Sequence, residues 1–137
     1  MTNNEEYIKK LRKSGLRPTN QRIKICEVLF NTDMTFHFTI KDLVEMIQEK
    51  ANQKISLATV YNTVHAFEKK GYLKEIAINS SQTYFDTNTN HHHHFYDEAN
   101  EELFDINNSE IDRININKEI PGKKIKSVEV LVKVENK

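Results

Sequence analysis

Four consecutive histidines occupy positions 91 to 94, and they are four of the six histidines in the chain. Imidazole is the commonest protein ligand for divalent transition metals, it binds haem iron, and it titrates near neutral pH. In an extended segment successive side chains point to opposite faces, so we expect His92 and His94 on one face and His91 and His93 on the other. The run predicts metal or haem binding, against the alternative of a solvated polar loop that continues the turn-like residues 86–90.

The composition limits what kind of protein carries this run. A length of 137 residues suits one domain or two small ones, and 37% hydrophobic with 29% charged residues is typical of a soluble globular protein. No apolar run approaches the roughly 18 residues of a membrane span, and the polar start is unlike a signal peptide, so we expect a cytoplasmic protein with no membrane partner. Cys26 is the single cysteine, which excludes a structural zinc site of four cysteines. Any metal must therefore use nitrogen and oxygen ligands.

The net charge is zero, but the two parts of the chain differ in sign. Residues 1–86 hold 13 Lys and Arg against 10 Asp and Glu, whereas residues 87–137 hold 7 against 10. The basic excess is densest in residues 1–31. Clustered cations favour contact with phosphates by releasing counterions, although charged runs are usually just solvated helix faces.

Residues 1–86 predict helices followed by two short strands. Helices are expected over residues 5–13 and after the capping residues Thr19, Thr39 and Ser56, with the last one ending at Gly71. The apolar face of that last helix comprises Leu57, Val60, Val64 and Phe67. Its opposite face carries Ser56, Thr59, Asn62 and Thr63.

Strands over residues 72–78 and 83–86, joined by a polar turn, complete this part. Three helices closed by a two-stranded wing form the winged helix-turn-helix, whose last helix lies in the major groove of DNA. We therefore predict that residues 1–86 bind double-stranded DNA. The alternative is a packed helical domain whose small polar face merely meets water.

Residues 87–137 predict a smaller α/β unit. We expect paired strands over 94–97 and 102–106, a helix over 108–118, and a strand over 123–134 with apolar residues at period two. Such a thin sheet buries little surface, so a second copy should complete it, and a homodimer would also suit two DNA half-sites. The predicted fold is thus α+β, an N-terminal winged helix-turn-helix domain followed by a small α/β dimerisation domain.

Three stretches of the sequence resemble the ferric uptake regulator (Fur) superfamily. They are residues 15–22 (GLRPTNQR), residues 56–63 (SLATVYNT), and Tyr84-Phe85-Asp86 followed by the histidine run. The resemblance spans nearly the whole chain. It implies a dimeric, winged-helix transcription regulator whose affinity for DNA is set by a metal or a metallocofactor.

The resemblance also implies ligands. The family's metal ligands correspond to His37, Asp86, His92, His94 and Asp105. Three imidazoles and two carboxylates suit Fe²⁺, Mn²⁺ or Zn²⁺. A second, histidine-rich family site corresponds to His91, His93 and Asp112, but its remaining histidine is replaced by Val128, so that second metal or haem site is incomplete.

Departures from the family pattern favour one branch. The Cys-x-x-Cys pair that many members carry after the histidines is replaced by Asp97 and Asn100, so structural zinc cannot be held by thiolates. Residues 84–106 resemble the iron response regulator (Irr) branch, which implies a regulator of iron homeostasis whose DNA binding is relieved by haem. The alternatives are a repressor dependent on Fe²⁺ or Mn²⁺, or a peroxide sensor, for which Asp105 in place of a longer glutamate is suitable.

We expect five residues to contact DNA. Arg22 would bind phosphate, and Arg17 would enter the minor groove unless it is only a surface charge beside a helix. The others are Thr59, Tyr61 and Asn62. A different class, a small non-haem metalloenzyme or a metal carrier, also uses His and carboxylate ligands. The absence of a nucleophile motif or a glycine-rich phosphate loop disfavours an enzyme.

Overall fold

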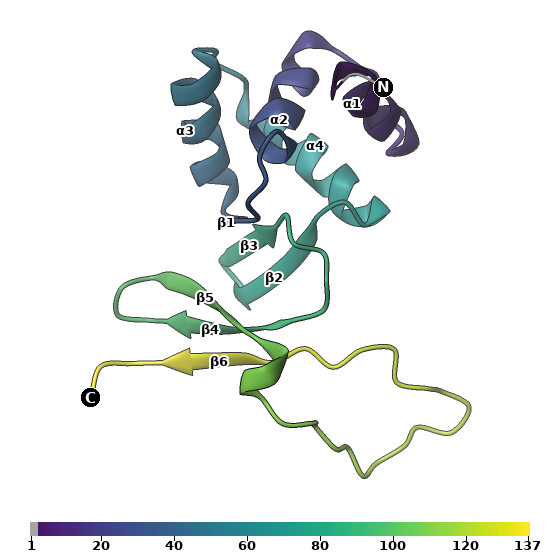
Figure 1. Ribbon diagram of the computed structural model, residues 1–137, viewed down its shortest axis with the longest axis vertical. Helices are drawn as coiled ribbons and strands as arrows, with labels where there is room; N and C mark the ends of the chain where they lie inside the picture. The colour runs from purple at the N-terminus through teal and green to yellow at the C-terminus, as the bar shows by residue number, and fades with distance from the viewer. Residues whose placement is uncertain (1–2) are drawn as a thin grey trace. The chain divides into compact units, whose positions relative to one another are not determined.

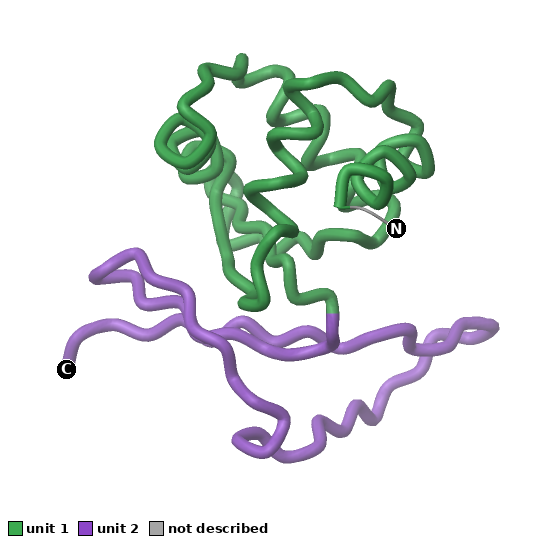
Figure 2. Tube along the Cα trace, turned by 45° about the horizontal axis from the view of Figure 1, so that its top comes forward, with its two compact units in different colours: residues 1–89 green, residues 90–137 purple. Residues whose placement is uncertain are grey.

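The computed structural model describes residues 3–137. The chain divides into two compact units, with the boundary between Thr89 and Asn90 (Figure 2). Both units contain short strands and the first also contains the α-helices, so the α+β class predicted from the sequence is confirmed. No helix within residues 3–137 has both the length and the apolar character needed to cross a membrane.

The first unit combines α-helices with a three-stranded antiparallel sheet (Figure 1). The helices are α1 (Asn3–Lys13), α2 (Asn20–Phe30), α3 (Ile40–Ala51) and α4 (Leu57–Lys70). The strands are β1 (His37–Phe38), β2 (Lys74–Asn79) and β3 (Gln82–Asp86), in the order β1-β3-β2. The expected helices and hairpin are present, whereas β1 is a third strand that the sequence pattern did not indicate.

Local capping explains where these helices begin and end. Thr19, Thr39 and Ser56 each stand at an N-cap and accept a hydrogen bond from the backbone N–H three residues later. For Thr39 the bond is returned, because the Asp42 carboxylate accepts from the Thr39 N–H at 3.0 Å and so completes a capping box. Gly71, at φ +92°, ends α4 in the left-handed conformation that glycine adopts without strain.

The core of the first unit lies between its helices and β3. Fully buried side chains from α1, α2, α3 and α4 meet Phe38 and Phe85 of the sheet. Two expectations for α4 are wrong. Leu57 is 63% exposed because it lies in the first turn, and Thr63 is buried because its hydroxyl donates to the Thr59 carbonyl at 2.7 Å and so needs no water.

The second unit contains a sheet of three short strands, β4 (His93–Asp97), β5 (Glu102–Ile106) and β6 (Leu131–Val134). Their order is β5-β4-β6, with β5 antiparallel and β6 parallel to the central β4 (Figure 1). The expected pairing of residues 94–97 with 102–106 is confirmed. Phe95 lies opposite Phe104, and both remain partly exposed, at 39% and 48%.

The expected helix over residues 108–118 is wrong. Only a 3₁₀ turn, η1 (Asn108–Glu110), forms there, and Ile111 is already extended at φ −137° and ψ 133°. The segment that follows alternates isoleucine with asparagine, and both residue types have low helix propensity. Local preference therefore favours extended backbone.

The strand expected over residues 123–134 is also shorter, since only Leu131–Val134 pairs. A strand needs a hydrogen-bonding partner, and its partners in β4 are His94 to Asp97. The chain from η1 to β6 therefore runs as a long arm without helix or strand (Figure 1).

Candidate metal centre and DNA-contact surface

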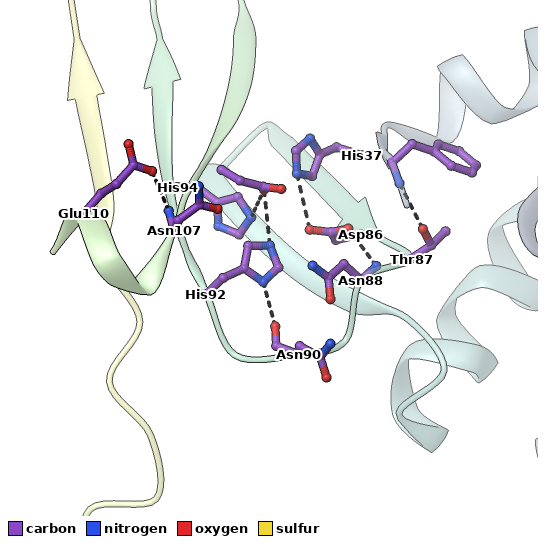
Figure 3. Close-up of polar contacts among 11 residues, drawn as sticks. His37, Asp86, Thr87, Asn88, Asn90, His92, His94, Asn107 and Glu110 are labelled. Atoms are coloured by element: carbon purple, nitrogen blue, oxygen red, sulfur yellow. Dashed lines mark hydrogen bonds and ion pairs between the residues drawn. The ribbon is translucent and has the colours of Figure 1, made fainter. Parts of the chain in front are cut away.

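A histidine and an aspartate meet on the sheet of the first unit. His37 of β1 lies opposite Asp86 at the end of β3, and His37 Nε2 is 3.3 Å from Asp86 Oδ2 (Figure 3). The Asp86 side chain is buried, and its Oδ1 accepts a hydrogen bond from the Asn88 N–H at 2.8 Å. Antiparallel pairing of two strands far apart in the sequence thus brings together the first two predicted ligands.

The residues beside this pair hold it in place. The Phe36 N–H donates to the Thr87 hydroxyl at 3.0 Å, and the Thr87 N–H donates to the Phe36 carbonyl at 3.1 Å. These bonds extend the β1–β3 pairing by one residue past His37 and Asp86. Sequence reasoning treated residues 86–90 as a simple turn and missed Thr87 and Asn88. The available signal was the Asp-x-Asn spacing, which favours a side chain that binds its own backbone two residues later.

The second unit brings together His92, His94 and Asp105. His94 lies opposite Asp105 in the β4–β5 pair, and His92 is on the same face because it is two residues away. The expected alternation of the histidine run is therefore confirmed. Asp105 Oδ1 is 3.2 Å from His92 Nε2 and 3.4 Å from His94 Nε2.

The tautomer of His92 is determined by its other ring nitrogen. His92 Nδ1 lies 2.6 Å from the carbonyl oxygen of Asn90 (Figure 3). A carbonyl oxygen only accepts hydrogen bonds, so Nδ1 carries the ring proton. In the neutral ring Nε2 therefore has a lone pair of electrons and is an acceptor. That lone pair faces the Asp105 carboxylate, which is also an acceptor. A proton or a cation between the two atoms is needed to make this contact favourable.

The spacing of these atoms fits a transition-metal ion. One ligand atom from each of His92, His94 and Asp105 lies within 4.8 Å of the other two. Nitrogen and oxygen ligands bind such ions at about 2.0 to 2.2 Å, so ligands that share one ion stand about 3 to 4 Å apart. The distances within both clusters fall in that range, and imidazole with carboxylate suits Fe²⁺, Mn²⁺ and Zn²⁺.

The residues expected to form a second site line a cleft of about 410 Å³ in the second unit. His91, His93 and Asp112 all reach it, but the two rings bind backbone groups. His91 Nε2 is 2.8 Å from the Val128 carbonyl oxygen, and His93 Nδ1 accepts from the Val130 N–H at 3.0 Å. His93 must therefore carry its ring proton on Nε2, which leaves no lone pair for a metal. The two rings hold the end of the arm next to β4.

Cys26 is buried in the core of the first unit. Burial raises the pKa of its thiol to about 12, because the charged thiolate would lose its hydration. A haem or metal ligand would have to be the thiolate, so Cys26 serves as a small core residue.

The predicted DNA-contact residues all belong to the first unit. Tyr61 and Asn62 are exposed on α4, and the Thr59 hydroxyl is 2.9 Å from that of Ser56 at the start of the helix. Arg17 is exposed in the loop before α2. Arg22 was expected to bind phosphate, but its Nη1 donates to the Arg17 carbonyl at 2.9 Å and so holds that loop.

Comparison with known proteins identifies the family. The model of the ferric uptake regulator family matches residues 13–134, which is most of the chain. The chain belongs to the ferric uptake regulator family. It is therefore a metal-responsive transcription regulator by family, rather than an enzyme.

A curated relative within the Fur family is the peroxide-responsive repressor PerR of Staphylococcus epidermidis. It is 33% identical over 110 residues, which are 80% of this chain and 71% of the relative. Among solved structures, the ferric uptake regulator of Pseudomonas aeruginosa with manganese matches with a TM-score of 0.68 and 22% identity, over 100% of this chain and 99% of that one. The ferric uptake regulator of Vibrio cholerae matches with a TM-score of 0.70 and 18% identity, over 94% and 98%. These structures establish a shared fold.

Proposed function

We propose that this Fur-family protein is a DNA-binding repressor that requires a divalent metal ion bound by His37, Asp86, His92, His94 and Asp105. The observation that carries the proposal is the cluster in the second unit, where the Asn90 carbonyl leaves a lone pair on His92 Nε2 beside Asp105. The His37–Asp86 pair supplies the remaining donors. If one ion takes ligands from both units, metal binding fixes the angle between them.

Fe²⁺ and Mn²⁺ are the ions that we favour. The donor set contains imidazoles and carboxylates and no thiolate, which disfavours ions that prefer sulfur. The related protein of Pseudomonas aeruginosa was solved with manganese. For these ions the carboxylates of Asp86 and Asp105 also reduce the positive charge of the bound ion.

Peroxide is the signal that we favour over haem. The 33% identical relative is a peroxide-responsive repressor, whereas the expected iron response regulator branch finds no support among these relatives. Bound Fe²⁺ would lend one electron to cleave the peroxide O–O bond and would regain it as the imidazole is oxidised, so that hydrogen peroxide is the net two-electron oxidant. One peroxide oxygen would convert an imidazole C–H of a ligand histidine into C–OH, and the other would leave as water. The oxidised ring binds metal poorly, so the repressor would release DNA.

The haem-responsive alternative has fewer ligands available. Cys26 is buried as a thiol, and the Val130 N–H occupies the Nδ1 lone pair of His93. Apart from the proposed metal ligands His92 and His94, the histidine run therefore offers haem only His91, whose Nε2 binds the Val128 carbonyl and whose Nδ1 keeps a lone pair.

For DNA binding we propose that residues 1–86 hold α4 in the major groove. Tyr61 and Asn62 are exposed on that helix and can reach base edges, and Thr59 lies one turn earlier. Arg17 would bind in the minor groove or at phosphate, with Arg22 holding its loop and adding positive charge.

We further propose that residues 87–137 form the dimerisation and sensing part. Phe95 and Phe104 form an exposed cross-strand pair on a sheet of only three short strands. A second copy would cover these rings and exposed isoleucines of the arm, such as Ile116 at 50%. A symmetric dimer would present two α4 helices to two half-sites of an operator.

The test is DNA binding at fixed salt by the metal-free protein, the Mn²⁺ form and the Fe²⁺ form. We expect tight, sequence-specific binding with either metal, and loss of binding after peroxide only for the Fe²⁺ form. Mass spectrometry should then find one added oxygen atom on a peptide that carries a ligand histidine. Metal-free binding that haem abolishes, with a Soret shift, would instead support the haem-responsive alternative.

A further inference from the structure

Four aromatic rings form a continuous row from the exposed face of α4 to the core of the first unit. We call Tyr61, His65, Phe85 and Phe38 the ring row. The Tyr61 and His65 ring centroids are 4.1 Å apart at an interplanar angle of 44°. His65 meets Phe85 edge to face at 5.5 Å and 85°, and Phe85 stacks on Phe38 at 5.9 Å and 28°.

The two ends of the ring row differ in their freedom to move. Phe85 and Phe38 are buried, and they are opposite each other in the β3–β1 pair. Tyr61 is 51% exposed, so packing restricts its side-chain torsions less than those of the two buried phenylalanines. His65 is one helical turn after Tyr61, at the i+4 spacing that places two side chains side by side on a helix.

A side chain that binds a partner loses its rotamer freedom at that moment. Immobilising a rotamer-rich side chain at an interface weakens binding by about two- to twelvefold, and holding it in place beforehand removes part of that cost. His65 is suited to this task because its ring contacts the Tyr61 ring and also meets the ring of the buried Phe85 edge to face. The contact surface of α4 is thereby anchored to β3.

We propose that His65 is a positioning residue, which holds the Tyr61 ring in the orientation that contacts DNA and acts on affinity only through Tyr61. This inference rests on the proposed DNA-binding function. It assigns a role to a histidine outside the proposed metal clusters. Through Phe85, strand β3 then helps to hold the DNA-contact side chain of α4 in place.

The test is a double-mutant cycle in the full-length Mn²⁺-loaded protein. The probe is a duplex selected from a random-sequence pool by the wild-type protein. Loss of His65 restores the part of the immobilisation cost that its contact with Tyr61 had removed, so His65→Ala should raise the DNA Kd about two- to tenfold. The double variant with Tyr61→Ala should match Tyr61→Ala alone within about twofold, which is the usual error of additivity. His65→Phe keeps a ring and should restore wild-type affinity.

A DNA-free measurement separates this inference from the proposed function. In NMR spectra of the free protein, the Tyr61 ring resonances, assigned by their loss in Tyr61→Ala, should shift in His65→Ala and shift less in His65→Phe. Unchanged resonances would overturn the inference, as would His65→Ala and Tyr61→Ala effects that simply add, since His65 would then contact DNA itself. A selected duplex that His65→Ala binds normally would also overturn it. Failure of the wild type to select any sequence would overturn the proposed function and, with it, this role for His65.

Discussion

Replacing Asp105 by asparagine tests the metal centre most directly. Its Oδ1 lies 3.2 Å from His92 Nε2 and 3.4 Å from His94 Nε2, so it touches both imidazoles of the cluster. Asparagine keeps the size and one oxygen but loses the negative charge. Outer-shell partners of metal sites alone contribute about 10- to 100-fold in affinity. We expect a direct ligand to exceed this, so Asp105→Asn should weaken Mn²⁺ binding at least about 100-fold, or about 2.7 kcal/mol.

The assay is a titration of the protein with Mn²⁺, in which electron paramagnetic resonance measures the free aqueous ion. Asp97→Asn is the matched control, because it makes the same substitution in the same unit at a turn carboxylate that binds the Asn100 amide. The control should titrate like the wild type. An Asp105→Asn variant that binds Mn²⁺ within about threefold of the wild type would refute the assignment of this cluster as a metal site.

The same titration tests whether one ion uses both clusters. His37 belongs to the first unit, and its partner there is Asp86. If the ion takes ligands from both units, His37→Ala should weaken Mn²⁺ binding about as strongly as replacement of a histidine ligand by alanine in the second cluster. Unchanged binding by His37→Ala would confine the site to His92, His94 and Asp105.

Three further predictions concern stability and reactivity. Hydrogen bonds from Asn100 lower the pKa of Asp97 in the folded protein. The charged carboxylate therefore stabilises the fold at pH values above its ordinary pKa of 3.8, and this contribution disappears as the pH falls through the lower pKa of the folded state. In urea unfolding, Asp97→Asn should be less stable than the wild type at neutral pH, and the difference should shrink in acid. Thr39→Ala removes the N-cap bond to the Asp42 N–H and should lower the free energy of unfolding by about 1 kcal/mol, with a conservative Thr39→Ser variant close to the wild type. Cys26, whose thiol pKa is raised to about 12, should not react with a disulfide reagent at about pH 8 until urea unfolds the protein, and rapid reaction of the native protein would contradict its burial.

Local signals in the sequence were sufficient for most of the first unit. Thr39 with Asp42 specifies where α3 begins, and Ser56 and Gly71 specify where α4 begins and ends, because caps act within a few residues. The helix predicted over residues 108–118 is absent, because their isoleucine and asparagine content favours extended backbone beyond the 3₁₀ turn.

Some features of the candidate ligands were likewise predictable from the sequence, and others were not. The position of His92 and His94 on one face follows from extended backbone alone, and their resemblance to family ligands needed only the sequence. The role proposed for His65 could not be predicted from the sequence, because nothing local distinguishes a single histidine on a helix. Its contact with Phe85, which belongs to a distant strand, is visible only in the structure. The incompleteness of the second site was visible at Val128, whereas the binding of His93 to the backbone of Val130 was not.

The sequence by itself determined the identities of the candidate metal ligands, the exclusion of a zinc site of four cysteines, the capped helices and the alternation of the histidine run. These depend on residue type and on neighbours within a few positions. Only the tertiary structure decided the pairing of His37 with Asp86, the contacts of Asp105 with His92 and His94, and the short length of β6. Those features depend on which distant backbone groups pair with one another, and pairing of that kind is a property of the folded chain rather than of any local segment.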